Sequence, residues 1–143
     1  MNDFHSDTLY QSIQQSKRQL IELLNSIVYI HYVNFKQTEI YSKIANLTRT
    51  FNYTEQNLLE KEIYTCFKDF IYNLSHLCPK ITRIETVICC LSFHLTMKKI
   101  SLCLGYVSTD TIRQHKFRIK NKMTVNSDNA FLFDFIFSGL KQR

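Results

Sequence analysis

The stretch 111–123, with the sequence TIRQHKFRIKNKM, decides how this chain is interpreted. Five of its thirteen residues are basic. Three of its apolar residues recur at spacings of seven and four, namely Ile112, Ile119 and Met123. Those spacings place the three on one face of a helix, while Arg113, Lys116 and Lys120 share another face. A helix that is anchored on one side and cationic on the other fits the major groove of DNA.

Composition favours an all-α fold for the 143 residues around this stretch. A hydrophobic share of 45% is ordinary for a globular chain, so disorder is not expected. Only 2 Gly and 1 Pro occur, whereas the pair usually makes up about 12% of a protein. Few tight turns can be built from that supply, and no alternating pattern is long enough to indicate a strand. We therefore predict helices joined by short polar loops.

Charge is distributed unevenly along the chain. Residues 1–79 carry seven Lys or Arg and eight Asp or Glu, whereas residues 80–143 carry eleven and four. The first part is thus close to neutral and the second part is strongly basic. This asymmetry favours an assembly region followed by an anion-binding region, although a solvated basic surface without a partner would give the same counts.

The five cysteines are odd in number and include no C-x-x-C pair. They are Cys66, Cys78, Cys89, Cys90 and Cys103. We interpret them as reduced thiols that act as small hydrophobic residues in a reducing cytoplasm. Burial of Cys89 and Cys90 is favoured over a role in sensing oxidation. We expect no metal site, because the paired Cys and His spacings of zinc sites are absent.

No membrane segment is expected. The N-terminus is polar, and the longest apolar runs, 27–33 and 130–137, are far shorter than the ~20 residues that span a bilayer. Phe131–Phe137 lies near basic residues and could instead bind a membrane surface, but closing the protein core is the favoured role. We therefore expect a soluble cytoplasmic protein.

A seven-residue repeat runs through residues 9–34 and predicts a coiled-coil seam. One set of positions is Ile13, Leu20, Ile27 and Asn34, and the other is Leu9, Ser16, Leu23 and Ile30. Six of the eight are apolar. Leu24, Val28 and Tyr32 widen this apolar face. Packing within the chain and self-association through this face therefore both remain open.

Further helices follow from apolar spacing and end signals. We predict helices over 38–49 and 55–76, the second ended by Pro79 because the residue before proline disfavours helical geometry. Thr82 and Glu85 have the capping-box spacing and open a helix to about Phe93.

Three more helices complete the basic part of the chain. Thr96 caps a helix that ends near Leu104, followed by Gly105 in a left-handed conformation. Ser108 or Thr109 caps the basic helix, which ends at Met123. The last helix starts at Asn126 or Ser127 and runs to Leu140.

This order of helices predicts a helix-turn-helix unit. Helices 96–104 and 108–123 form the pair, residues 105–107 form the turn, helix 82–93 is the scaffold, and helix 127–140 closes the core. In such a unit the second helix of the pair enters the major groove and the first crosses the DNA backbone.

The residues of this unit resemble a known family. Residues 111–123 resemble the signature T-[VI]-[KR]-x-H-x-x-x-[IV]-x-x-K-[LM] of the LuxR/GerE-type helix-turn-helix. Residues 81–88 (ITRIETVI) are similar to the family's opening L-T-x-x-E-x-x-V, and residues 99–101 (KIS) stand where it has E-I-A. Residues 70–79 (FIYNLSHLCP) match the F-x-x-x-L-x-x-x-x-P segment of a subgroup with an upstream helical coil.

The resemblance implies a helical dimerisation or signal-receiving region over 1–78 and a four-helix DNA-binding domain over 79–143. It implies that Arg113, Gln114 and Phe117 face base edges, since Arg suits guanine, Gln suits adenine and Phe can contact a thymine methyl. The implied phosphate contacts are Lys98, Lys99, Thr109, Thr111, Lys116 and Lys120. The expected partners are double-stranded DNA and a second copy of the chain, and an upstream sensor protein is left open.

The alternative is a protein-interaction module that kept this fold but lost DNA binding. The glycine usual between the first two helices of the family is missing at Ser92–Thr96, which is one residue short. Lys99 replaces the glutamate of E-I-A, and Phe117 is expected to be exposed. We expect no enzyme and no cofactor, because the sequence contains no nucleophile motif, phosphate loop or H-E-x-x-H.

Overall fold

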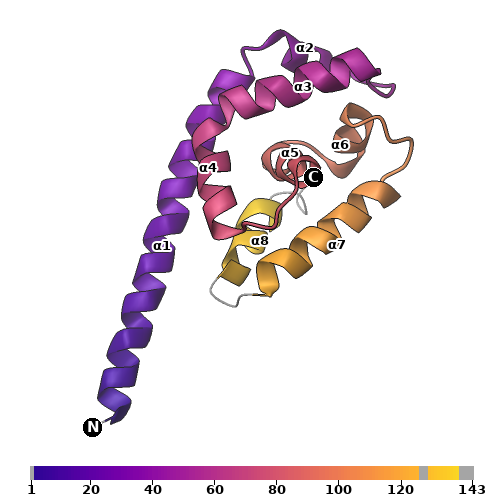
Figure 1. Cartoon of the computed structure of the whole chain (residues 1–143). Coiled ribbons are helices and arrows are strands. Elements are labelled where there is room, and N and C mark those ends of the chain that lie inside the picture. The colour runs from indigo at the N-terminus through magenta and orange to yellow at the C-terminus, as the bar shows by residue number, and fades with distance from the viewer. Residues whose placement is uncertain (1, 126–128, 139–143) are drawn as a thin grey trace.

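The computed structural model describes residues 2–125 and 129–138, and for residues 2–10, 12 and 13 it describes the backbone alone. Within these ranges the chain forms eight α-helices and no strand, so the all-α prediction is confirmed (Figure 1). They are α1 (Asn2–Phe35), α2 (Glu39–Ala45), α3 (Tyr53–Cys66), α4 (Lys68–Leu77), α5 (Arg83–Ser92), α6 (Met97–Cys103), α7 (Asp110–Thr124) and α8 (Ala130–Phe137).

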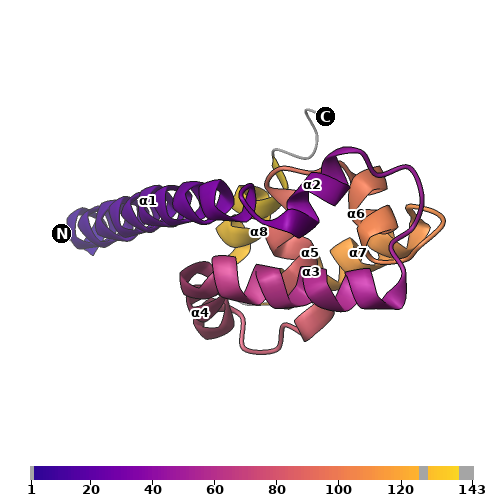
Figure 2. The same ribbon diagram turned by 90° about the horizontal axis from the view of Figure 1, so that it is seen from above.

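The longest helix, α1, buries side chains of its C-terminal part against the rest of the protein. Its N-terminal part projects away from the other helices in both Figure 1 and Figure 2. Among its described side chains, those that are buried are Leu24, Val28, His31 and Phe35, and the helix packs on α3 and α4. The fully buried positions therefore lie beside the predicted seam, and of the seam itself only Leu20 and Ile27 are among the described side chains packed in part against the core.

The seam residues of α1 are left partly or largely exposed. Leu23 and Ile30 are 54% and 59% exposed. Leu20 and Ile27 are half-buried, and Ser16 and Asn34 are exposed. The predicted positions Leu9 and Ile13 lie in the helix, but their side chains are outside the described set.

The predicted single helix over 55–76 is wrong, because the structure divides it into α3 and α4 at Phe67. Phe67 has φ −102° and ψ 23° and is 1% exposed. Its ring lies 5.7 Å from that of His31 and 5.8 Å from that of Phe35. The backbone N–H of Phe70 donates to His31 Nε2 at 3.3 Å. Contacts with α1 thus compensate for the break, and local spacing gave no sign of them.

The helix predicted over 38–49 is shorter than expected. Thr38 caps α2 by accepting a hydrogen bond from the N–H of Tyr41, but the helix ends at Ala45. Leu47 is buried at 7% exposure in the segment that follows. The backbone N–H of Leu47 donates to the carbonyl of Ile44 at 3.1 Å, so the chain turns out of the helix as Leu47 enters the core.

Helices α5 and α6 begin where the sequence predicts. Thr82 and Glu85 form a complete capping box on α5, and Thr96 accepts a hydrogen bond from the N–H of Lys99 at the start of α6. The predicted start of the last helix at Asn126 or Ser127, and its end at Leu140, lie outside the described residues. Within α8, Leu132, Ile136 and Phe137 are buried, which confirms that this helix closes the core.

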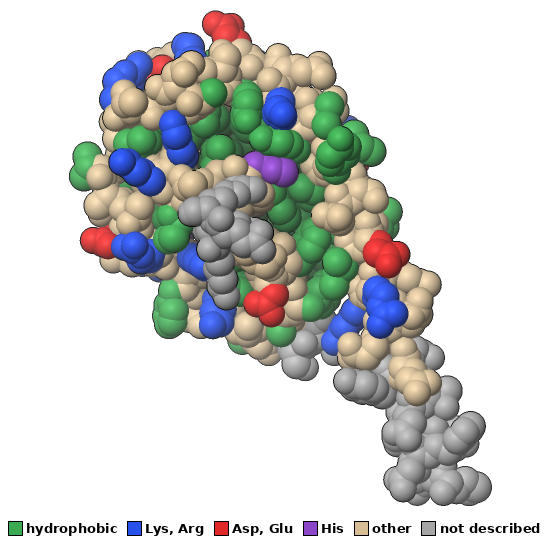
Figure 3. All heavy atoms as spheres, turned by 180° about the vertical axis from the view of Figure 1, so that it is seen from behind, with side chains coloured by type: hydrophobic (Ala, Val, Ile, Leu, Met, Phe, Trp, Pro, Cys, Tyr) green, Lys and Arg blue, Asp and Glu red, His purple; other side chains and the backbone are tan. Residues whose placement is uncertain are grey.

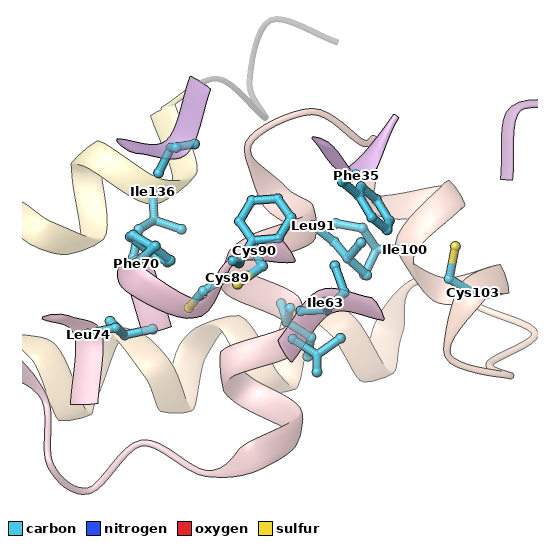
Figure 4. Close-up of a cluster of buried hydrophobic side chains, with 14 of the residues drawn as sticks. Phe35, Ile63, Phe70, Leu74, Cys89, Cys90, Leu91, Ile100, Cys103 and Ile136 are labelled. Atoms are coloured by element: carbon cyan, nitrogen blue, oxygen red, sulfur yellow. The ribbon is translucent and has the colours of Figure 1, made fainter. Parts of the chain in front are cut away.

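Helix α5 lies at the centre of one core cluster to which all eight helices contribute. Residues 85–92 of α5 are all buried. Figure 4 shows side chains of α1, α3, α4, α6 and α8 gathered around it. Because α3 packs directly on α5, the regions predicted as 1–78 and 79–143 share this core.

The cysteines are part of this interior. All five are free, and four are buried, while Cys66 is half-buried. Burial raises the pKa of the Cys89 and Cys90 thiols, and raises that of Cys103 to about 12. Thiols of this kind are poor nucleophiles, which agrees with a packing role.

Candidate DNA-binding surface

Helix α7 is held by its apolar face. Ile112, Ile119 and Met123 are 1%, 0% and 1% exposed, as predicted. The helix packs on α5, α6 and α8. Three buried anchors distributed over three turns fix both the direction and the rotation of α7, so the face it presents is well defined.

The turn before α7 depends on Gly105. This residue has φ +82°, the left-handed conformation predicted from the sequence. The N–H of Tyr106 donates to the carbonyl of Ser101 at 2.8 Å, which closes a Schellman motif at the end of α6. A Cβ at Gly105 would collide with the side-chain amide of Gln56, which itself donates to the carbonyl of Phe51 at 2.8 Å. The turn is therefore supported from α3.

The link between α5 and α6 closes without a glycine. Phe93 has φ −65° and ψ −29°, which any residue adopts. The N–H of Leu95 donates to the carbonyl of Leu91 at 3.0 Å. The ring of Phe93 packs against aromatic rings from α4 and α8. The short link at Ser92–Thr96 therefore keeps α5 and α6 in contact.

The three predicted base readers lie together on the solvent side of α7. Arg113 and Gln114 are exposed, and Phe117 is 64% exposed. Arg113 Nη1 donates to Asp110 Oδ1 at 3.0 Å, and both side chains are mostly exposed. Figure 3 shows Lys and Arg side chains gathered along the edge of the molecule that carries α6 and α7.

The predicted phosphate contacts are distributed around this face. Lys98 and Lys120 are exposed, whereas Thr109, Thr111 and Lys116 are half-buried. Lys116 Nζ lies 5.9 Å from the centre of the Phe133 ring and 5.5 Å from that of Phe137, and Lys120 Nζ lies 5.7 Å from Phe133. The two ammonium groups therefore sit over the aromatic side of α8, at the border of the exposed face.

Lys99 has a role within the protein. Its Nζ donates to the carbonyl of Leu47 at 2.8 Å and to that of Ile44 at 3.3 Å. These carbonyls lie at and beyond the C-terminal end of α2, where a cation is favourable. The substitution of lysine for the glutamate of the resembled motif thus attaches α2 to α6.

An ion pair at the back of α7 connects it to α5. Glu85 is 2% exposed, and its Oε1 accepts from Lys122 Nζ at 2.6 Å and from the N–H of Thr82 at 2.8 Å. Burial raises the pKa of the Glu85 carboxyl, but these hydrogen bonds outweigh burial and lower it overall. Glu85 is therefore ionised at neutral pH and helps to hold the C-terminal half of α7 in place.

His115 packs against the turn rather than facing solvent. Its Nε2 lies 3.5 Å from the hydroxyl of Tyr106, and the two rings are stacked with centres 6.1 Å apart. Burial, followed by the charge of Arg118, lowers the pKa of His115. A neutral imidazole at this position fits the packing role.

Two exposed residues of α7 belong to the same face but were not among the predicted contacts. Arg118 and Asn121 are exposed, four and seven residues after Gln114. Helical neighbours at these spacings share a face. The spacing from Gln114 was visible in the sequence and could have identified both.

A groove of about 400 Å³ runs beside this face. It is lined by Met97, Arg113, Lys116, Phe117, Lys120 and Phe133. Its walls come from α6, α7 and α8, and they combine basic and aromatic side chains. Phe117 therefore stands between the outermost face of α7 and a concave surface.

Comparison with known proteins gives no relative for this arrangement. No family model matches the chain, and no similar curated protein or solved structure was found. Among the described residues, no three His, Cys, Asp or Glu side chains gather as metal ligands. No helix in the described part of the chain is long and apolar enough to cross a membrane.

Proposed function

We propose that this protein is a sequence-specific DNA-binding transcriptional regulator of the LuxR/GerE-like helix-turn-helix class, working in the cytoplasm as a homodimer. The observation that carries the proposal is the position of α7. Its apolar face is buried in the helical cluster, while Arg113, Gln114 and Phe117 are exposed together on its outer side.

The packing of the neighbouring helices supports this function. Helices α5, α6 and α7 each pack on the other two, and α7 follows α6 after a tight turn. A recognition helix needs this support, because only a fixed helix can present the same side chains to each site. The motif resemblance over 79–123 also assigns α5, α6 and α7 the roles of scaffold helix, first helix of the pair and recognition helix, in that order.

Charge supports DNA as the ligand. Five basic side chains lie on α7, against one acidic residue in the same helix. The exposed pair of Arg113 and Asp110 has little net strength in water, so guanine can replace the carboxylate as the partner of Arg113. Lys116, Lys120 and Lys98 would grip phosphates, and affinity should therefore fall steeply with salt.

Binding to duplex DNA at two salt concentrations tests the proposal. Selection from a random duplex pool should yield a preferred sequence with two half-sites, as expected for a dimer. Arg113→Ala and Lys116→Ala should weaken binding, whereas Lys61→Ala, on the exposed surface of α3, should leave it unchanged. The proposal fails if no binding occurs at low salt, or if Arg113→Ala and Lys116→Ala both bind like the wild type.

A protein-interaction module is the second candidate, and the groove beside α7 favours it. An exposed aromatic residue at the edge of a concave surface is typical of a protein contact. Phe117→Ala would then abolish binding to a defined protein partner, and no DNA shift would be seen at low salt. That pair of results would favour this function over DNA binding.

A further inference from the structure

Helix α1 carries two apolar stripes: one is buried within the chain, and the other is only partly covered, since Leu20 and Ile27 pack against the core while Leu23 and Ile30 stay largely exposed. The inner stripe, from Leu24 to Phe35, faces α3 and α4. The other, here called the outer stripe, is made of Ser16, Leu20, Leu23, Ile27, Ile30 and Asn34. Leu23 and Ile30 expose more than half of their surface, which leaves an apolar strip open to water.

We infer that the outer stripe pairs with the same stripe of a second copy, with the two α1 helices parallel and in register. This inference rests on the proposed homodimer and names its interface, but it does not depend on DNA binding. The occupant is a second α1, because the outer stripe repeats every seven residues, and a helix with the same repeat matches such a stripe along its length.

The length of α1 supports this occupant. Its 34 residues form a rod about 51 Å long, and Leu24 is the first buried residue of the described side chains. The N-terminal part of the helix extends away from the other helices, as Figure 1 and Figure 2 show. The seven-residue repeat nevertheless begins at residue 9 in the sequence, fifteen residues before Leu24. An isolated helix is marginally stable in water, whereas pairing stabilises it.

The polar positions of the outer stripe determine the orientation. In a parallel pair in register, Ser16 meets Ser16 and Asn34 meets Asn34, and the four positions between them are apolar. A polar residue, above all Asn, at a seam position selects the register in which it meets its equivalent.

In antiparallel pairs, fewer positions of the outer stripe meet a residue of the same polarity on the partner helix. In one antiparallel register Ser16 meets Asn34, but α1 ends at Phe35, so the partner helix would stop beside residue 15 and leave the projecting part unpaired. The other antiparallel registers place Ser16 or Asn34 opposite an apolar residue. The parallel pair covers the whole repeat.

Mass measurements test the interface on the full chain without DNA. Sedimentation equilibrium at tens of micromolar should give twice the 17.1 kDa of one chain. Leu23→Glu should raise the dimer dissociation constant about 30-fold or more, because it places a charge in the seam. Tyr29→Glu is the matched control, since Tyr29 is 68% exposed but lies off the outer stripe, and this variant should remain dimeric.

Single cysteines test the orientation. Ser16→Cys and Asn34→Cys should each form a disulfide-linked dimer under mild oxidation. Arg18→Cys and Asn25→Cys, which are exposed but point away from the seam, should not, and they carry the same background from Cys66. The inference is overturned if the wild type is monomeric, if Leu23→Glu remains a full dimer, or if Ser16→Cys cross-links only to Asn34→Cys in a mixture.

Discussion

Helices α1 and α7 each combine a buried face with an exposed face, but the chemistry of their exposed faces differs. Each has one apolar face buried in the core and a second face open to water. The open face of α1 is apolar, with Leu23 and Ile30 exposed, whereas that of α7 carries Arg113, Gln114 and Phe117. An apolar open face gains from covering by another apolar surface, while a cationic face gains from an anionic ligand.

Under the proposed function, this difference separates assembly from recognition along the chain. The near-neutral first part contains the face suited to a second copy, and the basic second part contains the face suited to nucleic acid. Both faces depend on the same core around α5, so a change in that core should affect both. A change on either outer face should affect only one of them.

The largest expected effect compares the two stripes of α1 at adjacent residues. Leu24→Ala should lower the free energy of unfolding by about 3 kcal/mol, because it leaves a cavity at a fully buried position. Leu23→Ala should change unfolding of the monomer little and weaken the dimer. Urea unfolding at a protein concentration well below the dimer dissociation constant checks this, because dimerisation itself adds stability at higher concentrations. Equal losses in the two variants would contradict the division into two stripes.

Next in size is the loss of the ion pair behind α7. Glu85→Ala should cost about 2 kcal/mol of folding free energy, since it removes both a capping box and the partner of Lys122. Lys122 is 28% exposed and can still reach water, which limits the cost. Glu55→Ala removes the equivalent cap of α3, whose partner Arg49 is 65% exposed, and should cost less. A larger loss for Glu55→Ala in chemical denaturation would show that α7 does not depend on this contact.

On α7, Arg113→Ala on the exposed face and Lys116→Ala at its border should have different kinds of effect on DNA binding. The Arg113 change should cost about 1 to 2 kcal/mol at the selected DNA sequence and relax the preference for one base. Lys116→Ala should weaken binding to all sequences alike and reduce the slope of affinity against salt by about 1. Titrations of matched and mismatched duplexes separate the two. Identical behaviour would show that α7 carries charge without reading bases.

The smallest expected effect concerns pH and the inner stripe. Burial lowers the pKa of His31, while the charge of Asp69 raises it less. The folded state then binds fewer protons than the unfolded state below about pH 6.5, so stability is complete at neutral pH and declines as the pH falls. His31→Gln can still accept the N–H of Phe70 but does not titrate, and its stability should fall less between pH 7.5 and pH 5. A profile parallel to that of the wild type would exclude His31 as the source.

Local signals predicted much of the fold and the placement of α7. The caps at Thr82 and Thr96, the left-handed Gly105 and the buried face of α7 all follow from residue types and spacings within one or two turns. The break at Phe67 and the early end of α2 were missed. Both depend on residues far away in the sequence, His31 and Lys99, to which no local spacing points.

For the candidate DNA-binding surface too, some features could be predicted from local sequence, whereas others depend on contacts between distant residues. The sequence was enough to place Arg113, Gln114 and Phe117 on one exposed face, but not to show that Lys99 is held by α2 or that Lys116 and Lys120 lie over α8. Those contacts join helices distant in sequence, so residue type alone could not identify them.

The sequence by itself determined that the chain is helical, that α7 is cationic on one side, and that α1 has a seven-residue repeat. Apolar periodicity and capping signals involve residues only a few positions apart, so these properties can be predicted from the sequence. Only the tertiary structure decided which stripe of α1 is covered and which side of α7 stays open. Several apolar faces can compete for one core, and the contacts around α5 determine which of them are buried.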